Sequence, residues 1–236
     1  MNDIGTVGLT GDVARSPIVP ALAFGVVDGG VEPGAAAPTL RFTIAIDESS
    51  GMPVQSVMLT VQLYIAVNQR RYQRVEQERL GDVFGVPERW PETARRLYWT
   101  RATLVVPSFE RHTTTALLVP CTYDFDVVSA KYFHALEQGE IPLEFLFSGS
   151  VFFTNQHGAL ATARLAWESE AAYRLPVRVW KDMMDQYFPG SAWLRLRRDA
   201  FDRLHAYKVA QGLPGWDQAI EALLATADPA PNGTGE

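Results

Sequence analysis

The alternation of apolar and polar residues is clearest between Leu143 and Phe153, where nearly every second side chain is large and apolar. The apolar positions are Leu143, Phe145, Phe147, Val151 and Phe153, and Gly149 takes the remaining place in the row. Successive side chains of a β-strand point to opposite faces, so this spacing predicts a strand with one buried face. Glycine weakens a strand unless a bulge or a close approach requires it. We therefore expect the C-terminal helices to approach the strand at Gly149.

Similar strand patterns occur along much of the chain. The predicted strands are Ala21–Val27, Leu40–Ile46, Val57–Val67, Leu97–Val106, Thr113–Val119, Cys121–Val127 and Leu160–Trp167. The turn Asn155–Gly158 separates the last of these from the Leu143–Phe153 strand, which predicts a β-hairpin. About eight strands with few helices between them indicate an antiparallel sandwich rather than a parallel sheet.

Helical patterns interrupt or follow these strands in three places. In the arginine-rich stretch 68–96, Leu80 and Phe84 predict one side of a short helix that ends at Gly85. Ser129 is the predicted N-cap of a second short helix, which ends at Gly139. Beyond Glu168 the predicted helices begin at Pro176, after an N-cap at Ser191, and at Trp216.

These patterns together predict an α+β protein, mainly an antiparallel β-sandwich with a C-terminal helical segment packed on it. The predicted parts are a flexible lead-in (1–20), the sandwich (21–167) with an arginine-rich insertion (68–96), the helical segment (168–225) and a disordered tail (226–236). We expect the helical segment to pack on the sandwich instead of forming an independent domain.

Composition narrows the possible settings and partners. The chain has 236 residues, a net charge of −6 and no apolar run of about 18 residues, and its first residues lack the pattern of a signal peptide. We therefore expect a cytoplasmic protein outside the membrane. The negative charge argues against general binding to nucleic acids or anionic membranes. Cys121 is the single cysteine, which excludes an internal disulfide and multi-cysteine metal sites.

Candidate catalytic chemistry centres on Cys121 and on the carboxylate pair Asp124 and Asp126. A lone cysteine among four histidines (His112, His134, His157 and His205) is compatible with a Cys/His nucleophile. The strand pattern places Cys121 on one face with Tyr123 and Phe125, which favours an inert thiol. The phosphate-loop, HExxH and GxSxG motifs are absent from the sequence. We predict no catalytic residue, no cofactor and no metal.

Two regions are candidates for binding another protein. The first is the arginine-rich insertion, where Arg70, Arg71, Arg95 and Arg96 are positioned to meet an acidic partner. Its interleaved carboxylates favour internal pairing instead, at about 1 kcal/mol or less for each exposed pair. The second region carries Trp180, Tyr187, Trp193 and Trp216, residue types that dominate binding sites but that also dock helices onto sheets.

Two long stretches, CTYDFDVVSAKYFHALEQGEIPLEFLFSGSVFF and LPVRVWKDMMDQYFPGSAWLRLRRDAFDRLHAYK, resemble an uncharacterised bacterial family, a domain of unknown function. The resemblance covers nearly the whole chain. Members of that family are sometimes encoded near nickel–iron hydrogenase genes, so the resemblance implies an accessory or assembly role. It supplies no catalytic residues, and this chain lacks the cysteine-rich signatures of a metal donor or electron carrier.

The sequence thus favours a non-catalytic cytoplasmic binding or accessory protein, linked through the resemblance to assembly of a hydrogenase or another multi-subunit enzyme. The alternative is a small-molecule enzyme with a site near Cys121 and Asp124. Nothing in the sequence specifies the partner or the oligomeric state.

Overall fold

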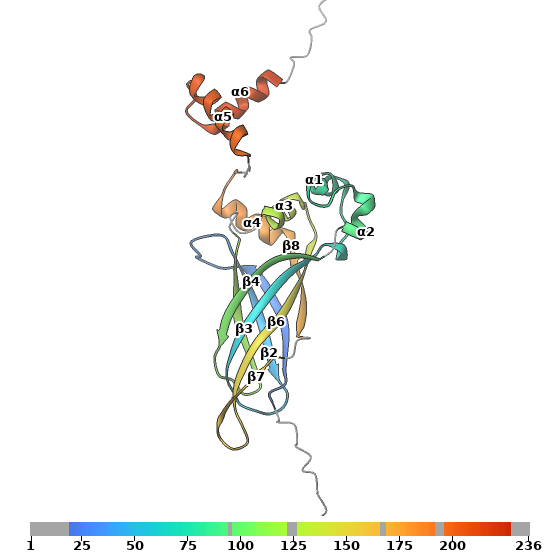
Figure 1. Cartoon of the computed structure of the whole chain (residues 1–236), viewed down its shortest axis with the longest axis vertical. Helices are drawn as coiled ribbons and strands as arrows, with labels where there is room; N and C mark the ends of the chain where they lie inside the picture. The colour runs from blue at the N-terminus through green and yellow to red at the C-terminus, as the bar shows by residue number, and fades with distance from the viewer. Residues whose placement is uncertain (1–18, 94–95, 122–126, 166–168, 192–195, 228–236) are drawn as a thin grey trace, which may run out of the picture. The chain divides into compact units, whose positions relative to one another are not determined.

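The computed structural model describes residues 19–93, 96–121, 127–165, 169–191 and 196–227 (Figure 1). The chain divides into two compact units, Met1–Pro189 and Gly190–Glu236. The predicted lead-in and tail fall almost wholly outside the described residues.

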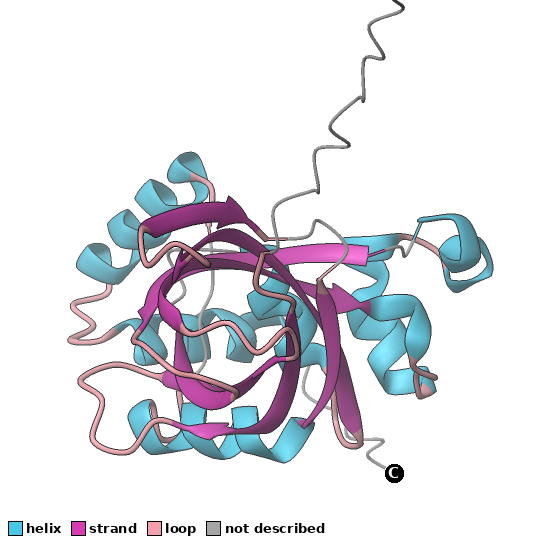
Figure 2. Ribbon diagram, turned by 90° about the horizontal axis from the view of Figure 1, so that it is seen from below, coloured by secondary structure: helices cyan, strands magenta, loops and turns pink. Residues whose placement is uncertain are grey.

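In the first unit, two antiparallel sheets face each other, as the view along the strands shows (Figure 2). The three-stranded sheet has the order β1 (Leu22–Val31), β2 (Thr39–Glu48), β5 (His112–Pro120). The five-stranded sheet has the order β4 (Arg96–Val106), β3 (Val54–Ala66), β6 (Glu140–Thr154), β7 (Leu160–Arg164), and β8 (Glu170–Pro176) also pairs with β6. The predicted α+β class with a sandwich-like arrangement is confirmed.

β6 contains the Leu143–Phe153 stretch and lies beside β3 at the centre of the larger sheet. All five of its alternating apolar side chains are buried. In the register of the pair, Leu63 lies opposite Phe145 and Val61 opposite Phe147. Because both strands turn every second side chain inward, their apolar residues form one continuous surface.

Aromatic rings join that surface to the smaller sheet. Phe147 on β6 stacks on Phe24 of β1 with ring centroids 4.6 Å apart. Phe145 meets the edge of Phe42 on β2 at 5.1 Å. Such pairs stabilise a core beyond the area that they bury. The inward-facing alternation of both sheets therefore produces one hydrophobic interior.

Gly149 has a structural role, but not the one expected from the sequence. Its φ is +149°, and a Cβ on it would lie 2.0 Å from the carbonyl oxygen of Met58 on the neighbouring β3. The close approach therefore comes from β3 and not from the C-terminal helices. Along the other edge of β6, β8 pairs with the first half and β7 with the second, so Gly149 lies where the partner strand changes.

Helices cover one end of this sandwich (Figure 1). They are α1 (Arg74–Phe84), α3 (Val127–Ala135) and α4 (Val177–Tyr187), with the short η1 (Val67–Gln69), η2 (Pro87–Arg89) and α2 (Trp90–Thr93). α1 buries Leu80 and Phe84 and ends at Gly85 with φ +75°, as the sequence predicted. α4 follows Pro176 directly, also as predicted.

Several element boundaries differ from the sequence-based expectation. The segment 168–225 is not helical throughout, because its first part forms β8, and α4 belongs to the first unit. α3 begins at Val127, so Ser129 lies inside the helix instead of capping it, and Val127 is not the end of a strand. The rest of the predicted Cys121–Val127 strand, apart from Cys121, lies outside the described residues.

The second unit contains α5 (Arg198–Ala210) and α6 (Trp216–Ala227), joined by a turn at Gly212. α5 begins at Arg198, later than an N-cap at Ser191 would require. The ring of Trp216 contacts Phe201 and His205 of α5, at centroid distances of 5.2 and 5.9 Å. We call residues 196–227 the C-terminal hairpin.

Candidate functional site

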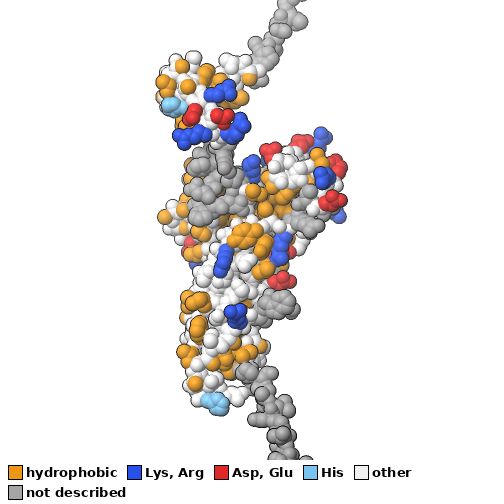
Figure 3. All heavy atoms as spheres, in the orientation of Figure 1, with side chains coloured by type: hydrophobic (Ala, Val, Ile, Leu, Met, Phe, Trp, Pro, Cys, Tyr) orange, Lys and Arg blue, Asp and Glu red, His pale blue; other side chains and the backbone are white. Residues whose placement is uncertain are grey.

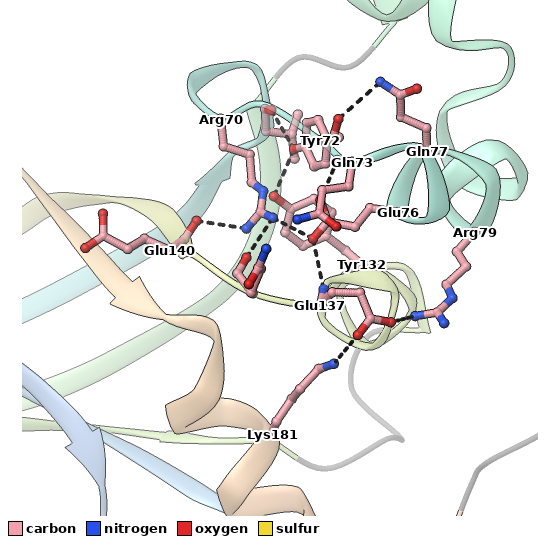
Figure 4. A network of polar contacts seen from close by, with 12 residues as sticks. Arg70, Tyr72, Gln73, Glu76, Gln77, Arg79, Tyr132, Glu137, Glu140 and Lys181 are labelled. Carbon is pink, nitrogen blue, oxygen red and sulfur yellow. Dashed lines mark hydrogen bonds and ion pairs between the residues drawn. The ribbon is translucent and has the colours of Figure 1, made fainter.

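We call the helices that cover this end of the sandwich, α1, α3 and α4, the helical cap. A polar network within it contains the most deeply buried charges that the structure describes (Figure 4). Arg70, which follows η1, reaches inward and donates to Glu76 of α1 over 2.7 Å. The same guanidinium donates to the main-chain oxygens of Gln138 and Glu140, each at 3.0 Å. Arg70 therefore ties α1 to the start of β6.

Glu76 is fully buried and serves three donors at once. Besides Arg70, it accepts from the main-chain N of Gln73 at 2.9 Å and from that of Glu137 at 2.9 Å. Gln73 and Glu76 together form the capping box of α1. A buried carboxylate requires a cation and further donors, and Glu76 has both.

Two tyrosines lie beside this ion pair. The hydroxyl of Tyr72 donates to the carbonyl of Val67 at 2.6 Å and contacts the hydroxyl of Tyr132 at 2.9 Å. Burial raises the pKa of Tyr72 to about 12, although the hydrogen bond with Tyr132 and the nearby Arg70 act in the opposite direction. Burial also raises the pKa of Tyr132. Both phenols thus stay protonated at neutral pH and act as packing and hydrogen-bonding groups.

At its outer edge the network continues through Glu137, which follows α3. Its carboxylate pairs with Arg79 of α1 and lies 3.6 Å from the Nζ of Lys181 on α4. The hydrogen bond from Arg79, followed by the charge of Lys181, lowers the pKa of Glu137. The network therefore joins α1, α3 and α4 and pairs its charges with one another, as a structural support does, while the buried Nε of Arg70 has no hydrogen-bond partner among the described residues.

The arginines of the insertion are thus used largely for internal pairing. Arg70 pairs with Glu76 and Arg74 with Glu78, both within the insertion. Arg96 pairs with Glu144 of β6 at 2.6 Å and stacks over Tyr64 at 4.3 Å. Arg71 is exposed, whereas Arg95 lies outside the described residues.

The four aromatic candidates lie in different environments. Trp180 is 3% exposed and stacks on Phe133 at 5.4 Å, so its ring is part of the core. Tyr187 is partly buried and donates to the carbonyl of Ala35 at 2.5 Å. Trp216 is partly exposed on the C-terminal hairpin. Trp193 is not among the described residues.

The structure gives the catalytic candidates no common site among the described residues. Cys121 is only partly exposed, and burial of its thiol raises the pKa to about 12. His112 pairs with Asp47 at 2.8 Å, whereas His134 lies on α3, His157 in the β6–β7 turn and His205 on α5. Asp124 and Asp126 fall outside the described residues.

The described residues have few features of a ligand site or a membrane helix. They contain no group of three or more His, Cys, Asp or Glu arranged to hold a metal ion. No helix in the described ranges is long and apolar enough to cross a membrane. A groove of about 420 Å³ lies between α1 and the turn after it. Its lining residues are Arg74, Gln77, Glu78, Gly81, Gly85, Val86 and Pro87.

The C-terminal hairpin has the opposite character, because its apolar side chains are at the surface (Figure 3). Its exposed apolar residues are Leu196, Phe201, Val209, Trp216, Ile220, Leu223 and Leu224. Ala219 is the one buried residue in the described part of the unit. Of the exposed apolar residues of the hairpin, only Trp216 was predicted from the sequence to bind a partner. The available signal was α6 itself, whose apolar residues outnumber those that one neighbouring helix can cover.

Comparison with solved structures gives remote likenesses, which carry no argument about fold or function. A CARDB domain from Pyrococcus furiosus, solved with di-metal ions, has a TM-score of 0.27 and 10% identity over 66% of this chain and 92% of that one. A putative late embryogenesis abundant protein has a TM-score of 0.29 and 12% identity, over 67% and 73%. The sporulation control protein Spo0M of Bacillus subtilis has a TM-score of 0.24 and 9% identity, over 67% and 49%.

A search of curated proteins found no match to the chain. A family model, in contrast, matches residues 19–232, which include most of each unit and all of the described residues. The chain therefore belongs to the family of unknown function DUF6084.

Proposed function

We propose that this protein is a non-catalytic binding or accessory protein and that the C-terminal hairpin is its docking element. One observation carries the proposal: α5 and α6 expose most of their large apolar side chains, with Val209 at 64% and Leu224 at 61%. Helices of 12 or 13 residues are marginal alone in water and gain stability by packing an apolar face. A contiguous exposed apolar surface marks an interaction site. The partner in this proposal is a protein surface.

The described part of the first unit supports the non-catalytic part of the proposal. Its most buried charges are paired with each other, as in the ion pair formed by Arg70 and Glu76, although the Nε of Arg70 has no hydrogen-bond partner among the described residues. The pKa values of Tyr72 and Cys121 are raised by burial, away from the range that suits acid–base or nucleophilic catalysis at neutral pH. These groups resemble a structural support more than a reaction centre.

A link to the assembly of a hydrogenase or another multi-subunit enzyme is a finer proposal, which rests on the family resemblance in the sequence. This finer proposal specifies the kind of partner. The protein bound through the hairpin must be a subunit or an assembly factor of such an enzyme.

The test is affinity capture of the full-length tagged chain from native lysate, followed by identification of every co-purified chain, untagged copies of itself included. The hairpin variant is Val209→Glu/Leu224→Glu, and the matched control is Leu160→Glu, at an exposed position of β7. We expect a stoichiometric partner with the wild type and the control, and its loss with the hairpin variant. Equal capture by all three chains, or no partner with any of them, would contradict the proposal.

A further inference from the structure

β5 is an edge strand of the smaller sheet. On one side it pairs with β2, from His112 to Pro120, without a register shift. β4, the strand before it in the chain, belongs to the other sheet and pairs with β3. The second edge of β5 therefore has no hydrogen-bonded strand among the described residues.

The register shows which main-chain groups point to that open edge. In an antiparallel ladder, alternate residues direct both their N–H and their C=O to the same neighbouring strand. Just before β5, the carbonyl of Arg111 accepts from the N–H of Glu48 at 2.7 Å. Just after β5, the N–H of Cys121 donates to the carbonyl of Pro38 at 2.7 Å. Odd-numbered residues of β5 thus face β2, and even-numbered residues face the open edge.

Three residues in the middle of β5 present unpaired main-chain groups at that edge. They are Thr114, Ala116 and Leu118, and neither the N–H nor the C=O of any of them has a hydrogen-bond partner in the described ranges. Their side chains lie on the outer face of the sheet, because those of Leu117 and Val119 are buried in the core. A row of unpaired donors and acceptors on an exposed strand is a template for another strand.

The other edge strands of the two sheets carry features that oppose such pairing. The registers of β1 and β4 with their neighbours are each interrupted by a shift. β4, β7 and β8 also carry the exposed charges Arg101, Arg164 and Arg174. Bulges and charged side chains are the usual protection of a sheet edge. Residues 113–119 of β5 include no charge, no proline and no register shift, so this edge is unprotected.

The open edge of β5 matches a second copy of itself. Ala116 is the midpoint of His112–Pro120, so a two-fold axis there lays two β5 strands antiparallel in full overlap. Ala116 then lies opposite itself and Thr114 opposite Leu118, and each pair exchanges two hydrogen bonds. At the ends, His112 lies opposite Pro120, which has no N–H to donate. Residues 113–119 bring no like charges together in this register.

The surroundings of the edge favour this occupant over a foreign peptide. Proteins that add a foreign peptide to a sheet edge select it through pockets for its alternate side chains. The side chains beside this edge are a threonine, an alanine and a leucine, without charge. The groove that the described residues form is lined by α1 and the turn after it, and not by β5.

We propose that two copies of this chain associate through β5, which joins their three-stranded sheets into one continuous sheet. The contact is separate from the docking of the C-terminal hairpin and does not depend on it. One strand pair buries less surface than the roughly 800 Å² per partner of a standard interface, so the population of dimer depends on concentration.

Sedimentation velocity of the full-length chain, from about 1 to 500 µM, measures this equilibrium. The expected mass rises from 26.2 kDa toward twice that value. Amide hydrogen exchange locates the contact without any substitution. The amides of Thr114, Ala116 and Leu118 should exchange about tenfold or more slowly at the high concentration than at the low one, because they become hydrogen-bonded in the dimer. The amides of Thr115 and Leu117, which face β2, should be protected at both concentrations.

Charged variants at the two-fold axis test the register. In Ala116→Lys or Ala116→Glu alone, identical charges lie directly opposite each other, which should raise the dissociation constant about tenfold or more. An equimolar mixture of the two should associate again, because lysine then faces glutamate. Ala172→Lys is the matched control, since Ala172 is an exposed alanine of another edge strand, β8, and it should associate like the wild type. Urea unfolding at low concentration checks that each variant is folded.

Each result supports or overturns part of the inference. A wild-type chain that stays monomeric throughout the range overturns the self-association. A dimer with unchanged exchange at Thr114, Ala116 and Leu118 overturns its location, and so does a dimer that persists in both charged variants. Loss of the dimer in Val209→Glu/Leu224→Glu, with Ala116→Lys still dimeric, assigns the contact to the hairpin instead of β5. Failure of the mixture to associate overturns the two-fold axis at Ala116.

Discussion

The two units of this protein contain similar apolar residues but use them differently. In the first, two sheets and a helical cap enclose the large side chains, and Phe145, Leu63 and Tyr132 are fully buried. In the second, two short helices meet through a few rings and leave Val209 and Leu224 at the surface. Layers with apolar faces on both sides close a core, whereas a pair of short helices has too few neighbours to do so. Similar types of apolar residue are therefore enclosed in a core in one unit and exposed at the surface in the other.

The charged residues show the same contrast. Inside the helical cap, Glu76 accepts hydrogen bonds from Arg70 and from two main-chain N–H groups. On the hairpin, Asp217 and Glu221 have no ion-pair partner among the described residues. A buried charge must be satisfied within the molecule, while an exposed one remains free for a partner. If the interior of the first unit is closed in this way, changes to its buried groups should have larger effects than changes to exposed ones.

The largest expected effect concerns the thiol of Cys121. With a pKa raised to about 12 by burial, the native thiol has little thiolate at pH 8. Alkylation should therefore be roughly a thousandfold slower in the native chain than in denaturant, where the thiol has an ordinary pKa of about 8.5. Iodoacetamide labelling followed by mass spectrometry measures both rates. Fast native labelling would show that the first unit is open at this position and would revive the nucleophile hypothesis.

The next test concerns the junction at Gly149. Gly149→Val forces a Cβ against the Met58 carbonyl at a φ that valine rarely adopts. We expect a loss of about 4 kcal/mol in the free energy of unfolding, from strain and overpacking together. The control is Gly30→Ala, also within a strand but with open space around its Cβ, and its effect should stay below about 0.5 kcal/mol. Urea unfolding measures the loss of stability in both variants. Equal unfolding midpoints would show that the close approach of β3 does not require glycine at position 149.

The third test removes the buried charge of Glu76. Glu76→Gln keeps the shape of the side chain but leaves Arg70 without its counter-ion, which should lower the free energy of unfolding by about 3 kcal/mol. Glu78→Gln is the exposed counterpart on the same helix, where loss of the pair with Arg74 should cost less than about 1 kcal/mol. If the two variants lose the same free energy of unfolding in urea, the buried ion pair stabilises the first unit no more than the exposed one does.

The smallest effect is the pH dependence of Glu48. Its carboxylate accepts from the main-chain N of Gly51 at 2.7 Å and of Ser50 at 2.8 Å, and from the Ser50 hydroxyl. Burial alone raises the pKa of Glu48, but the hydrogen bonds from Ser50, Ala21 and Gly51 together hold it below 4.5. The folded state therefore binds this proton less readily than the unfolded state, and the contribution to stability is complete above pH 4.5 and is lost as the pH falls through the folded pKa.

Glu48→Gln measures that contribution. We expect a loss of about 1–2 kcal/mol at pH 7, because hydrogen bonds to a charged acceptor are replaced by weaker ones. The difference from the wild type should shrink as the pH falls below 4.5. A difference that stays constant from pH 7 to pH 3 would contradict the assignment. Urea titrations at several pH values provide the measurement.

The strands were predictable from the sequence to the extent that one face of each is buried. Alternate residues of Leu143–Phe153 are apolar except at Gly149 and form the inner face of β6, and the run that begins at Val57 forms the inner face of β3. β8 was not predicted, because its small and charged residues carry little alternation and Pro176 indicates the helix that follows. Start and stop residues were reliable where the backbone requires them, as at Gly85, and not at Ser129 or Ser191.

The candidate site was much less predictable. Trp180 and Trp216 are the same residue type on two of the predicted C-terminal helices, yet one is in the core and the other is partly exposed. Arg70 was singled out as a binding residue, but its partner Glu76 and the main-chain acceptors of Gln138 and Glu140 hold it inside. Such outcomes depend on which distant segment covers a side chain, and local spacing contains no information about that.

By itself, the sequence determined the alternation of the strands, the end of α1 at Gly85 and the net charge of −6, because these depend on neighbours along the chain or on composition. The tertiary structure alone decided that the carbonyl of Met58 lies against Gly149, that Arg70 and Glu76 are buried together and that the hairpin leaves Leu224 uncovered. Those features arise between residues far apart in sequence, where packing in space decides what is enclosed and what remains available for a partner.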